Sequence, residues 1–232
     1  MRRAEINQAG RAAEPATLPG AKRFALSVDV EDYFQVWAFS GVVARSDWDA
    51  FDLRVEASTE RLLALFADRG ATATFFILGW IAERAPRLVR RIADLGHEVA
   101  SHGYDHAKVF DQSPDEFQRD VLKAKRILED AAGVGVKGFR AAGFSFGPRT
   151  PWAHEILAEA GHVYSSSTHP IAHDHYGDPK GARAPFMKDG VIEAPVAVAD
   201  VLGARVACAG GGWFRAAPYP VAKALYAFAA SS

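Results

Sequence analysis

The feature that most constrains the fold is an alternation of short apolar runs with segments of helical pattern along residues 24–166. Strands that alternate with helices at this spacing build βαβ units. The chain is therefore predicted to form a mostly parallel α/β sheet, open or closed into a barrel. The apolar runs that predict buried strands are 24–30, 72–77, 97–100, 136–140 and 163–166.

Helical patterns fill the intervals between these runs. The third helix has the clearest start, because Ser113 is suited to cap it and Glu116 can close a capping box. Residues 168–185 carry no such pattern and predict a long loop, which in a compact domain is often functional. The predicted helices are 56–69, a stretch ending at 95 that is interrupted at Pro86, 114–131, and 151–161.

Composition excludes several classes of protein. The chain has 232 residues, 49% of them hydrophobic, which is typical of a globular fold with a large core. A formal net charge of -1 argues against a nucleic-acid binder that works by bulk charge, so no nucleic-acid partner is expected. The single cysteine, Cys208, excludes a disulfide framework.

The N-terminal segment has no apolar core of the kind that secretion signals carry. Residues 1–22 are therefore predicted to be a flexible leader, and 23–232 to be one folded domain. No apolar run approaches the length of a membrane span, so we expect no membrane span and a cytoplasmic location.

Three carboxylates follow the first predicted strand. Asp29, Glu31 and Asp32 lie within four residues, and carboxylates this close repel one another unless a cation or a proton lies among them. Sites in parallel α/β folds gather at the carboxyl ends of strands, so this cluster predicts a metal ligand together with a general base. A solvated strand end or a helix N-cap is the alternative interpretation.

Two histidines follow the third predicted strand. If the segment is helical, His102 and His106 lie one above the other and both imidazoles reach one metal ion. With a carboxylate and a water molecule they would form an open metal site, in which Asp105 could orient a ligand. The alternative is a pair of surface histidines near a turn.

Further polar residues occur at the end of the fourth strand and in the long loop. Arg140 would orient a catalytic carboxylate or clamp substrate, and a surface ion pair is its alternative. The expected substrate-binding residues are His173, Asp174, Tyr176 and Trp213. Histidines suit polar recognition, and a tryptophan suits stacking on a sugar. Aromatic residues at such spacing are, however, more often part of a core.

In order, these motifs resemble the polysaccharide deacetylase family with the NodB homology domain, carbohydrate esterase family 4. Within it, the chain is similar to the branch found with exopolysaccharide and exosortase (PEP-CTERM) gene clusters. The matching segments are SVDVEDYFQV (27–36), RLLALFADRGATATFFILGWIAER (61–84), GHEVASHGYDH (96–106), GFRAAGFSF (138–146), HDHYG (173–177) and GGGWFRAAPYP (210–220).

The resemblance implies a distorted, incomplete (β/α) barrel and a divalent metal ion, most often Zn²⁺, held by one aspartate and two histidines. His102 and His106 match the histidine pair. The acidic motif matches less closely: we take Asp32 as the ligand and Asp29 as the catalytic base, with Glu31 as the competing candidate for either role.

The resemblance also implies that Arg140 positions the catalytic carboxylate. The family has a proton-donating histidine in a strand beyond the position of Tyr219, and this sequence has none there. We therefore expect the C-terminal part of the family's domain to be missing, with His173 as a substitute proton donor only if its loop folds inward.

The expected activity is metal-dependent hydrolysis of N-acetyl groups on the amino sugars of a polysaccharide, in exopolysaccharide biosynthesis. Two alternatives stay open at this point: a metal-independent amide hydrolase of the allantoinase type, and a catalytically impaired relative that binds carbohydrate. A glycosidase with two carboxylates is less favoured, because its chemistry does not require the two histidines.

Overall fold

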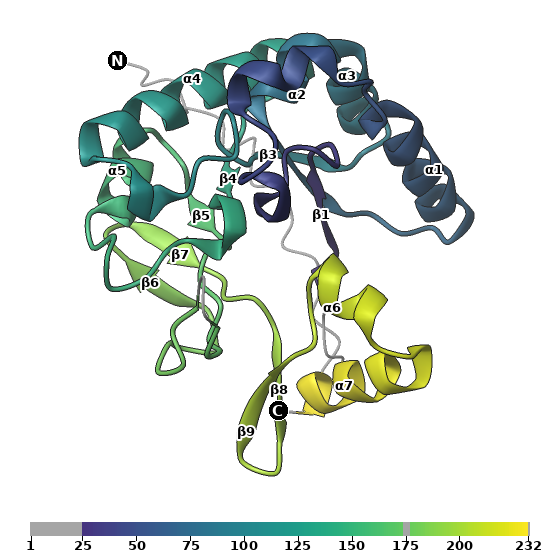
Figure 1. Ribbon diagram of the computed structural model, residues 1–232, viewed down its shortest axis with the longest axis vertical. Helices are drawn as coiled ribbons and strands as arrows, with labels where there is room; N and C mark the ends of the chain where they lie inside the picture. Colours follow the sequence, from purple (N-terminus) through teal and green to yellow (C-terminus); the bar gives the residue numbers. More distant parts are fainter. Residues whose placement is uncertain (1–24, 174–176, 232) are drawn as a thin grey trace, which may run out of the picture.

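The computed structural model describes residues 25–173 and 177–231, so the predicted leader lies outside the described residues. A seven-stranded sheet with the order β1-β2-β3-β4-β5-β7-β6 forms its centre (Figure 1). The strands of this sheet are β1 (Ser27–Val30), β2 (Thr74–Ile77), β3 (Glu98–Ser101), β4 (Gly138–Phe139), β5 (Tyr164–Ser165), β6 (Phe186–Lys188) and β7 (Val191–Glu193).

Helices α1 to α5 lie around the strands of this sheet (Figure 1). They are α1 (Val55–Asp68), α2 (Gly79–Arg84), α3 (Pro86–Asp94), α4 (Pro114–Ala132) and α5 (Ala153–Glu159). The capping box predicted for α4 is present, because the Ser113 side chain accepts from the Glu116 N–H and the Glu116 side chain accepts from the Ser113 N–H. Pro86 separates α2 from α3, as the sequence predicted.

Neighbouring strands are parallel from β1 through β5 to β7, and β6 is antiparallel to β7. Among the described strands, β1 and β6 each have one neighbour in this sheet, so the sheet stays open. The predicted parallel α/β architecture of an incomplete barrel is confirmed. The predicted strand 136–140 is shorter than expected, since only Gly138–Phe139 pair as β4.

The connection from β1 to α1 is long and is held by aromatic packing. It contains the 3-10 helices η1 (Trp37–Phe39) and η2 (Arg45–Ala50). Phe34 is 2% exposed, and its ring lies 5.9 Å from Trp48 and 5.9 Å from Trp80. This packing joins the loop to α2, so that the carboxyl end of β1 is covered by an ordered segment.

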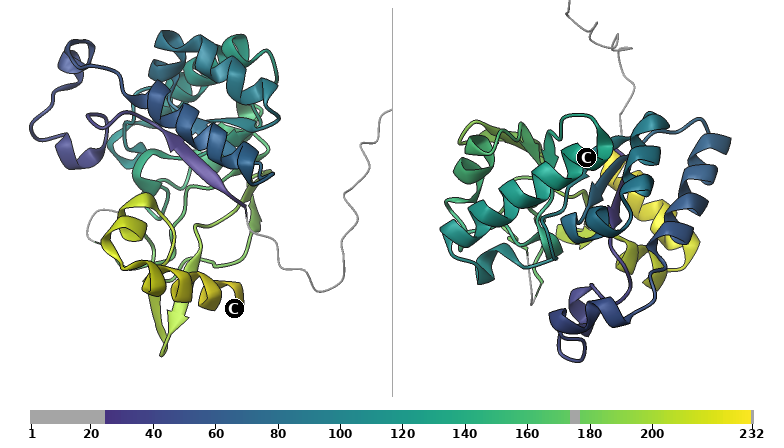
Figure 2. Two further views of the ribbon diagram at one scale, coloured as in Figure 1. Left: turned by 90° about the vertical axis from the view of Figure 1, so that its right-hand side faces the viewer. Right: turned by 90° about the horizontal axis from the view of Figure 1, so that it is seen from above.

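The C-terminal part forms a separate layer of the fold. β8 (Val198–Val201) and β9 (Ala204–Ala207) pair in an antiparallel hairpin, followed by α6 (Gly211–Ala216) and α7 (Tyr219–Ser231). Leu202 and Gly203 have φ of 52° and 83°, which suits a two-residue hairpin turn. α7 packs against β8 (Figure 2). None of the helices in the described ranges is long and apolar enough to cross a bilayer.

Candidate metal centre

The site is built on one row of residues that crosses six strands. The parallel register places the last residues of these strands side by side: Val30, Ile77, Ser101, Phe139, Ser165 and Glu193. The residues one position further along the chain therefore leave the sheet at the same edge. They include Glu31 after β1, His102 after β3 and Arg140 after β4.

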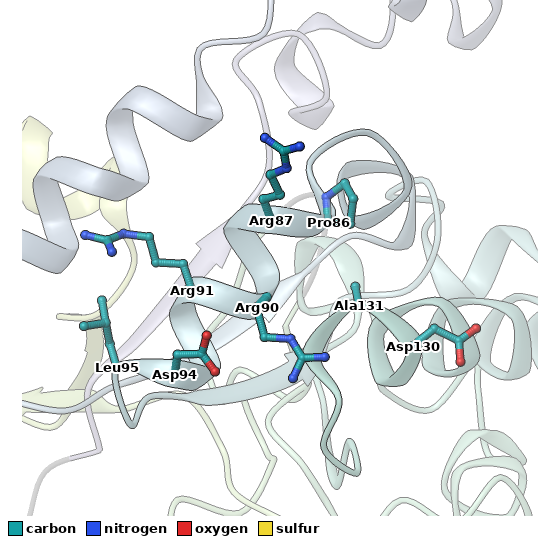
Figure 3. A pocket seen from close by; sticks show the side chains of 8 residues that line it. All are labelled: Pro86, Arg87, Arg90, Arg91, Asp94, Leu95, Asp130 and Ala131. Carbon is teal, nitrogen blue, oxygen red and sulfur yellow. The ribbon is translucent and has the colours of Figure 1, made fainter.

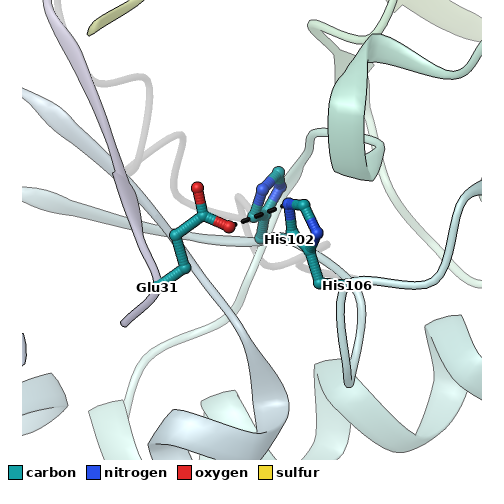
Figure 4. Close-up of side chains that lie close together, drawn as sticks. All are labelled: Glu31, His102 and His106. Carbon is teal, nitrogen blue, oxygen red and sulfur yellow. Dashed lines mark ion pairs between the residues drawn. The ribbon is translucent and has the colours of Figure 1, made fainter. Parts of the chain in front are cut away.

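Glu31, His102 and His106 converge at this edge (Figure 4). One ligand atom of each residue lies within 4.8 Å of the others. A carboxylate oxygen and two imidazole nitrogens form a donor set typical of zinc sites that keep an open position. The structure thus brings together the two predicted histidines and the residue that the sequence left as the competing candidate for the carboxylate.

His102 is held in the tautomer that a metal ligand needs. Its Nδ1 lies 2.8 Å from the backbone oxygen of Arg140, so Nδ1–H donates to that oxygen and Nε2 keeps its lone pair. The side chain is 2% exposed, and burial lowers the pKa of His102 below its usual value. The ring is therefore neutral, as metal ligation requires.

His106 faces Glu31 from the other side of the cluster. Its Nε2 lies 2.8 Å from Oε2 of Glu31, and that oxygen is buried without a well-aligned hydrogen bond. Burial would lower the pKa of His106, but the Glu31 carboxylate outweighs this effect and raises it. Oε2 of Glu31 has no further polar partner among the described residues, and a divalent cation bound here would take the place of the His106 proton. These residues therefore fit a divalent metal ion.

The segment that carries His102 and His106 is not helical, although the sequence analysis expected a helix to bring the two imidazoles together. His106 has a φ of 61°, in the left-handed region, so the turn itself brings its ring toward His102. Gly103 has a φ of 75°, and a Cβ there would lie 2.9 Å from Oδ2 of Asp120. Asp120 accepts from the N–H of Tyr104 at 3.1 and 3.2 Å, which fixes the turn against α4.

Asp29 and Arg140 form an ion pair beside the cluster. A guanidinium nitrogen of Arg140 lies 2.6 Å from Oδ1 of Asp29. Burial would raise the pKa of the Asp29 carboxyl, but Arg140 and the two histidines together hold it below its usual value. Asp29 is thus an ionised carboxylate adjacent to the candidate metal ligands, and its position is compatible with the base predicted from the sequence.

Arg140 is itself fixed by the strand next to it. Its Nε donates to the backbone oxygen of Ser166 at 3.1 Å, and a terminal nitrogen donates to Oγ of Ser166 at 3.1 Å. The guanidinium also lies 4.0 Å from the centroid of the Phe76 ring. One guanidinium nitrogen of Arg140 donates to Asp29, and the other two donate to Ser166 and fix the orientation of the Arg140 side chain.

A buried carboxylate that the sequence analysis missed anchors this part of the site. Glu193 is 0% exposed and accepts from the N–H groups of Ser167 and Thr168, each at 2.8 Å. Its other oxygen lies 3.1 Å from Nε2 of His154. Glu193 therefore fixes the segment that holds Arg140. A glutamate inside the apolar run of β7 is the signal that could have identified it, because such a residue is rarely buried without partners.

Asp32 does not belong to the cluster, and its predicted role as the metal ligand is corrected. One oxygen accepts from the N–H groups of Arg54 and Val55 at 2.7 and 3.0 Å, and the other accepts from the N–H of Tyr33 at 2.9 Å. The carboxylate thus caps the start of α1, which is the N-cap alternative that its sequence position left open. Glu31 takes the position that the sequence assigned to Asp32.

The predicted substrate-binding residues lie elsewhere or outside the described part. His173 is half-buried and is not a member of the cluster; burial, and after it the nearby His173, lowers the pKa of His169. Asp174 and Tyr176 lie outside the described residues. Trp213 belongs to α6, and its side chain is outside the described part of the structure.

Two cavities lie away from the cluster. One, of about 430 Å³, lies between α3 and α4 and is lined by Arg87, Arg90, Arg91 and their neighbours (Figure 3). None of the candidate site residues lines it, so we assign it no part in the chemistry. The other, of about 270 Å³, is lined by His154, Thr168 and His169 and therefore adjoins the segment that holds Arg140.

Comparison with known proteins identifies the family. Residues 47–165, just over half of the chain, match the polysaccharide deacetylase family. This chain belongs to the polysaccharide deacetylase family. Residues 166–231 of this deacetylase-family chain match a domain of unknown function (DUF3473).

Named relatives agree with this family. A peptidoglycan-N-acetylglucosamine deacetylase of Bacillus cereus is 35% identical over 116 residues, which cover 48% of this chain and 40% of that protein. A chitooligosaccharide deacetylase of Sinorhizobium fredii is 29% identical over 140 residues, covering 60% of this chain and 62% of that protein. The deacetylase-family chain thus spans about half the length of these curated relatives.

A solved structure shares the fold. It is a Mycobacterium smegmatis protein assigned to the polysaccharide deacetylases, 26% identical, with a TM-score of 0.60 over 79% of this chain and 62% of that one. The family predicted from the ordered motifs is confirmed.

Proposed function

We propose that this chain hydrolyses N-acetyl groups on the amino sugars of a polysaccharide, with a divalent cation, Zn²⁺ foremost, held by Glu31, His102 and His106. The observation that carries the proposal is the convergence of three ligand atoms within 4.8 Å, next to an ionised carboxylate. A metal-independent amidase would have no need for this convergence.

The donor set supports zinc over the harder cations. Two imidazole nitrogens and one carboxylate oxygen suit Zn²⁺, whereas magnesium and calcium prefer oxygen ligands alone. When bound, such a cation would polarise the acetyl carbonyl and lower the pKa of a coordinated water molecule. His102 is already neutral and oriented for this purpose by the backbone of Arg140.

The remaining catalytic work falls to residues of the chain. Asp29 is ionised and accepts a proton from the attacking water. Arg140 keeps the Asp29 carboxylate charged and, through its two bonds to Ser166, aimed into the site. Hydrolysis then releases acetate and leaves a free amino group on the sugar.

The substrate class is proposed from the relatives and from the sequence motifs. The named relatives are deacetylases of peptidoglycan and of chitooligosaccharides, so an N-acetylated glycan is the proposed substrate. The resemblance of the ordered motifs to the branch found with exopolysaccharide gene clusters makes an exopolysaccharide our choice among such glycans.

The test combines zinc calorimetry with acetate release from N-acetylglucosamine hexamers. We expect about one zinc ion per chain, lost in His102→Ala and His106→Ala. We expect Asp29→Asn to keep zinc and to lose about 10²- to 10⁴-fold in turnover, the usual contribution of a general base.

Each alternative function predicts a different result. Absence of specific zinc binding by the folded protein, with turnover retained, would favour the metal-independent amidase. Zinc binding and glycan binding without acetate release would favour a carbohydrate-binding relative. Retention of full turnover in Asp29→Asn would overturn the role of Asp29.

A further inference from the structure

The loops beside the candidate metal centre carry a strip of alternating aromatic rings and cations, formed by Trp37, Lys108, Phe110 and Arg149. The Lys108 ammonium lies 4.0 Å from the centroid of the Trp37 ring and 5.5 Å from that of Phe110. The Arg149 guanidinium lies 3.6 Å from the centroid of the same Phe110 ring. The four side chains are therefore one continuous surface feature, which we call the aromatic–cation strip.

The chain places this strip next to the metal ligands. Lys108 is two residues beyond His106, so their Cα atoms are at most about 7.6 Å apart. Trp37 lies in the loop that begins at Glu31, in η1. A glycan whose N-acetyl group reaches the cluster would therefore pass close to the loops that carry the strip.

The strip is held in position from beneath. Val109, between Lys108 and Phe110, is 1% exposed, and its N–H donates to Oγ of Ser145 at 3.0 Å. Its neighbours on both sides, Lys108 and Phe110, are only partly buried. Trp37 is 41% exposed, so part of this residue faces solvent.

The two cations of the strip are not neutralised by carboxylates. Within residues 25–173 and 177–231, neither Lys108 nor Arg149 forms an ion pair within 4.0 Å, although Asp111 lies near Lys108. Arg45, by contrast, lies over Trp48 at 4.4 Å and also pairs with Asp105 at 3.2 Å. An aromatic ring attracts a cation less strongly than a carboxylate does. Lys108 and Arg149 can therefore still bind an anionic ligand.

Resting on the proposed function, we infer that the aromatic–cation strip binds an acidic glycan, so that the substrate is an N-acetylated polysaccharide bearing carboxylate groups on neighbouring units. The rings stack on the apolar faces of the sugars, and Lys108 and Arg149 pair with the carboxylates. This surface therefore selects among glycans that all carry the N-acetyl group to be removed.

The experiment compares two hexasaccharides by calorimetry on the zinc-loaded full chain carrying Asp29→Asn, in which turnover is expected to be about 10²- to 10⁴-fold slower. One is the neutral N-acetylglucosamine hexamer, and the other alternates N-acetylglucosamine with glucuronate. At low ionic strength we expect the acidic hexasaccharide to bind about tenfold more tightly, with the preference falling as salt is added. Lys108→Ala and Arg149→Ala should each reduce the preference about threefold, and together abolish it.

Three further variants separate charge from packing. Lys108→Arg should keep the preference, and Arg126→Ala, which removes an exposed cation from α4, should leave it unchanged. Trp37→Ala should weaken both hexasaccharides equally, because stacking does not depend on the carboxylates. Thermal unfolding of each variant shows that the fold is retained.

Equal affinity for the two hexasaccharides, binding of neither, or a preference that survives the double substitution would overturn the inference. A single-stranded oligonucleotide that binds as tightly and with the same dependence on Lys108 and Arg149 would also overturn it. Failure of the proposed function is distinguishable: the acidic preference would persist in a chain that binds no zinc or releases no acetate.

Discussion

Two substitutions one residue apart test the assignment of Glu31, rather than Asp32, to the metal centre. In the described structure the polar contact of the Glu31 carboxylate is with His106. Glu31→Gln keeps an amide oxygen that can still accept from His106 and loses only the ion pair, so the free energy of unfolding of the metal-free protein should stay within about 1 kcal/mol of the wild type. Its zinc affinity should fall by more than the roughly 10- to 100-fold that loss of an outer-shell partner costs.

Asp32→Ala should have the opposite effect. It removes an acceptor for the N–H groups of Arg54 and Val55 at the start of α1, and for that of Tyr33. Hydrogen bonds to a charged group contribute about 1.5–3 kcal/mol, and loss of a helix cap costs about 1–2 kcal/mol. We expect a loss of about 3 kcal/mol, which for a chain of this size is a fall of roughly 6–12 °C in Tm.

The assay must separate folding from metal binding, because zinc stabilises whatever form binds it. Unfolding is therefore measured by urea titration in the presence of a chelator, and zinc affinity by calorimetry well below the Tm of each variant. Zinc binding that is lost in Asp32→Ala and kept in Glu31→Gln, with equal stabilities, would refute the reasoning and restore Asp32 as the ligand.

Three further predictions concern buried ionisable groups. Glu193→Ala leaves His154 and two backbone N–H groups without their acceptor and should cost about 3–5 kcal/mol in urea unfolding; a loss below 1 kcal/mol would contradict the anchoring role. Burial raises the pKa of Asp120 to about 7, so the folded state holds a proton that the unfolded state releases near pH 4. The free energy of unfolding should therefore fall as the pH rises from about 4 to about 7. At about pH 8, Asp120→Asn should be more stable than the wild type by up to about 4 kcal/mol. Burial lowers the pKa of His162 to about 4, so on acidification the unfolded state gains a proton before the folded state does. Between about pH 6.5 and pH 4, the free energy of unfolding of the wild type should fall by up to about 3 kcal/mol more than that of His162→Leu.

The sheet and most of the helices could be predicted because their signals are local. Apolar runs, the Ser113 capping box and the break at Pro86 each depend on a few adjacent residues. Strands β6 to β9 were not predicted, because no helix separates them and the strand–helix alternation that predicted β1 to β5 ends before them. Their pairing is set by contacts with segments already folded, such as β7 beside β5.

The alternation of side chains along β1 distinguishes Glu31 from Asp32 in the sequence. Successive side chains of a strand point to opposite faces, so Asp29 and Glu31 share one face and Asp32 shares the other with Val30. Val30 is 1% exposed in the core, which places Asp29 and Glu31 toward the site. Asp32 was instead predicted as the ligand from the family's usual pair of adjacent acidic residues, and the structure places Glu31, not Asp32, beside the two histidines.

The network around Arg140 could not have been predicted in the same way, since it depends on register across four strands. Glu193 ends β7, in the row that also contains Ser165 and Phe139. It fixes the backbone after β5, where Ser166 holds Arg140, and Arg140 in turn holds Asp29. Stability and catalysis are therefore coupled through a carboxylate that touches none of the candidate metal ligands. If this chain of contacts positions the base, Glu193→Gln should lower kcat and leave both zinc affinity and KM near their original values, whereas general loosening of the fold would change all three.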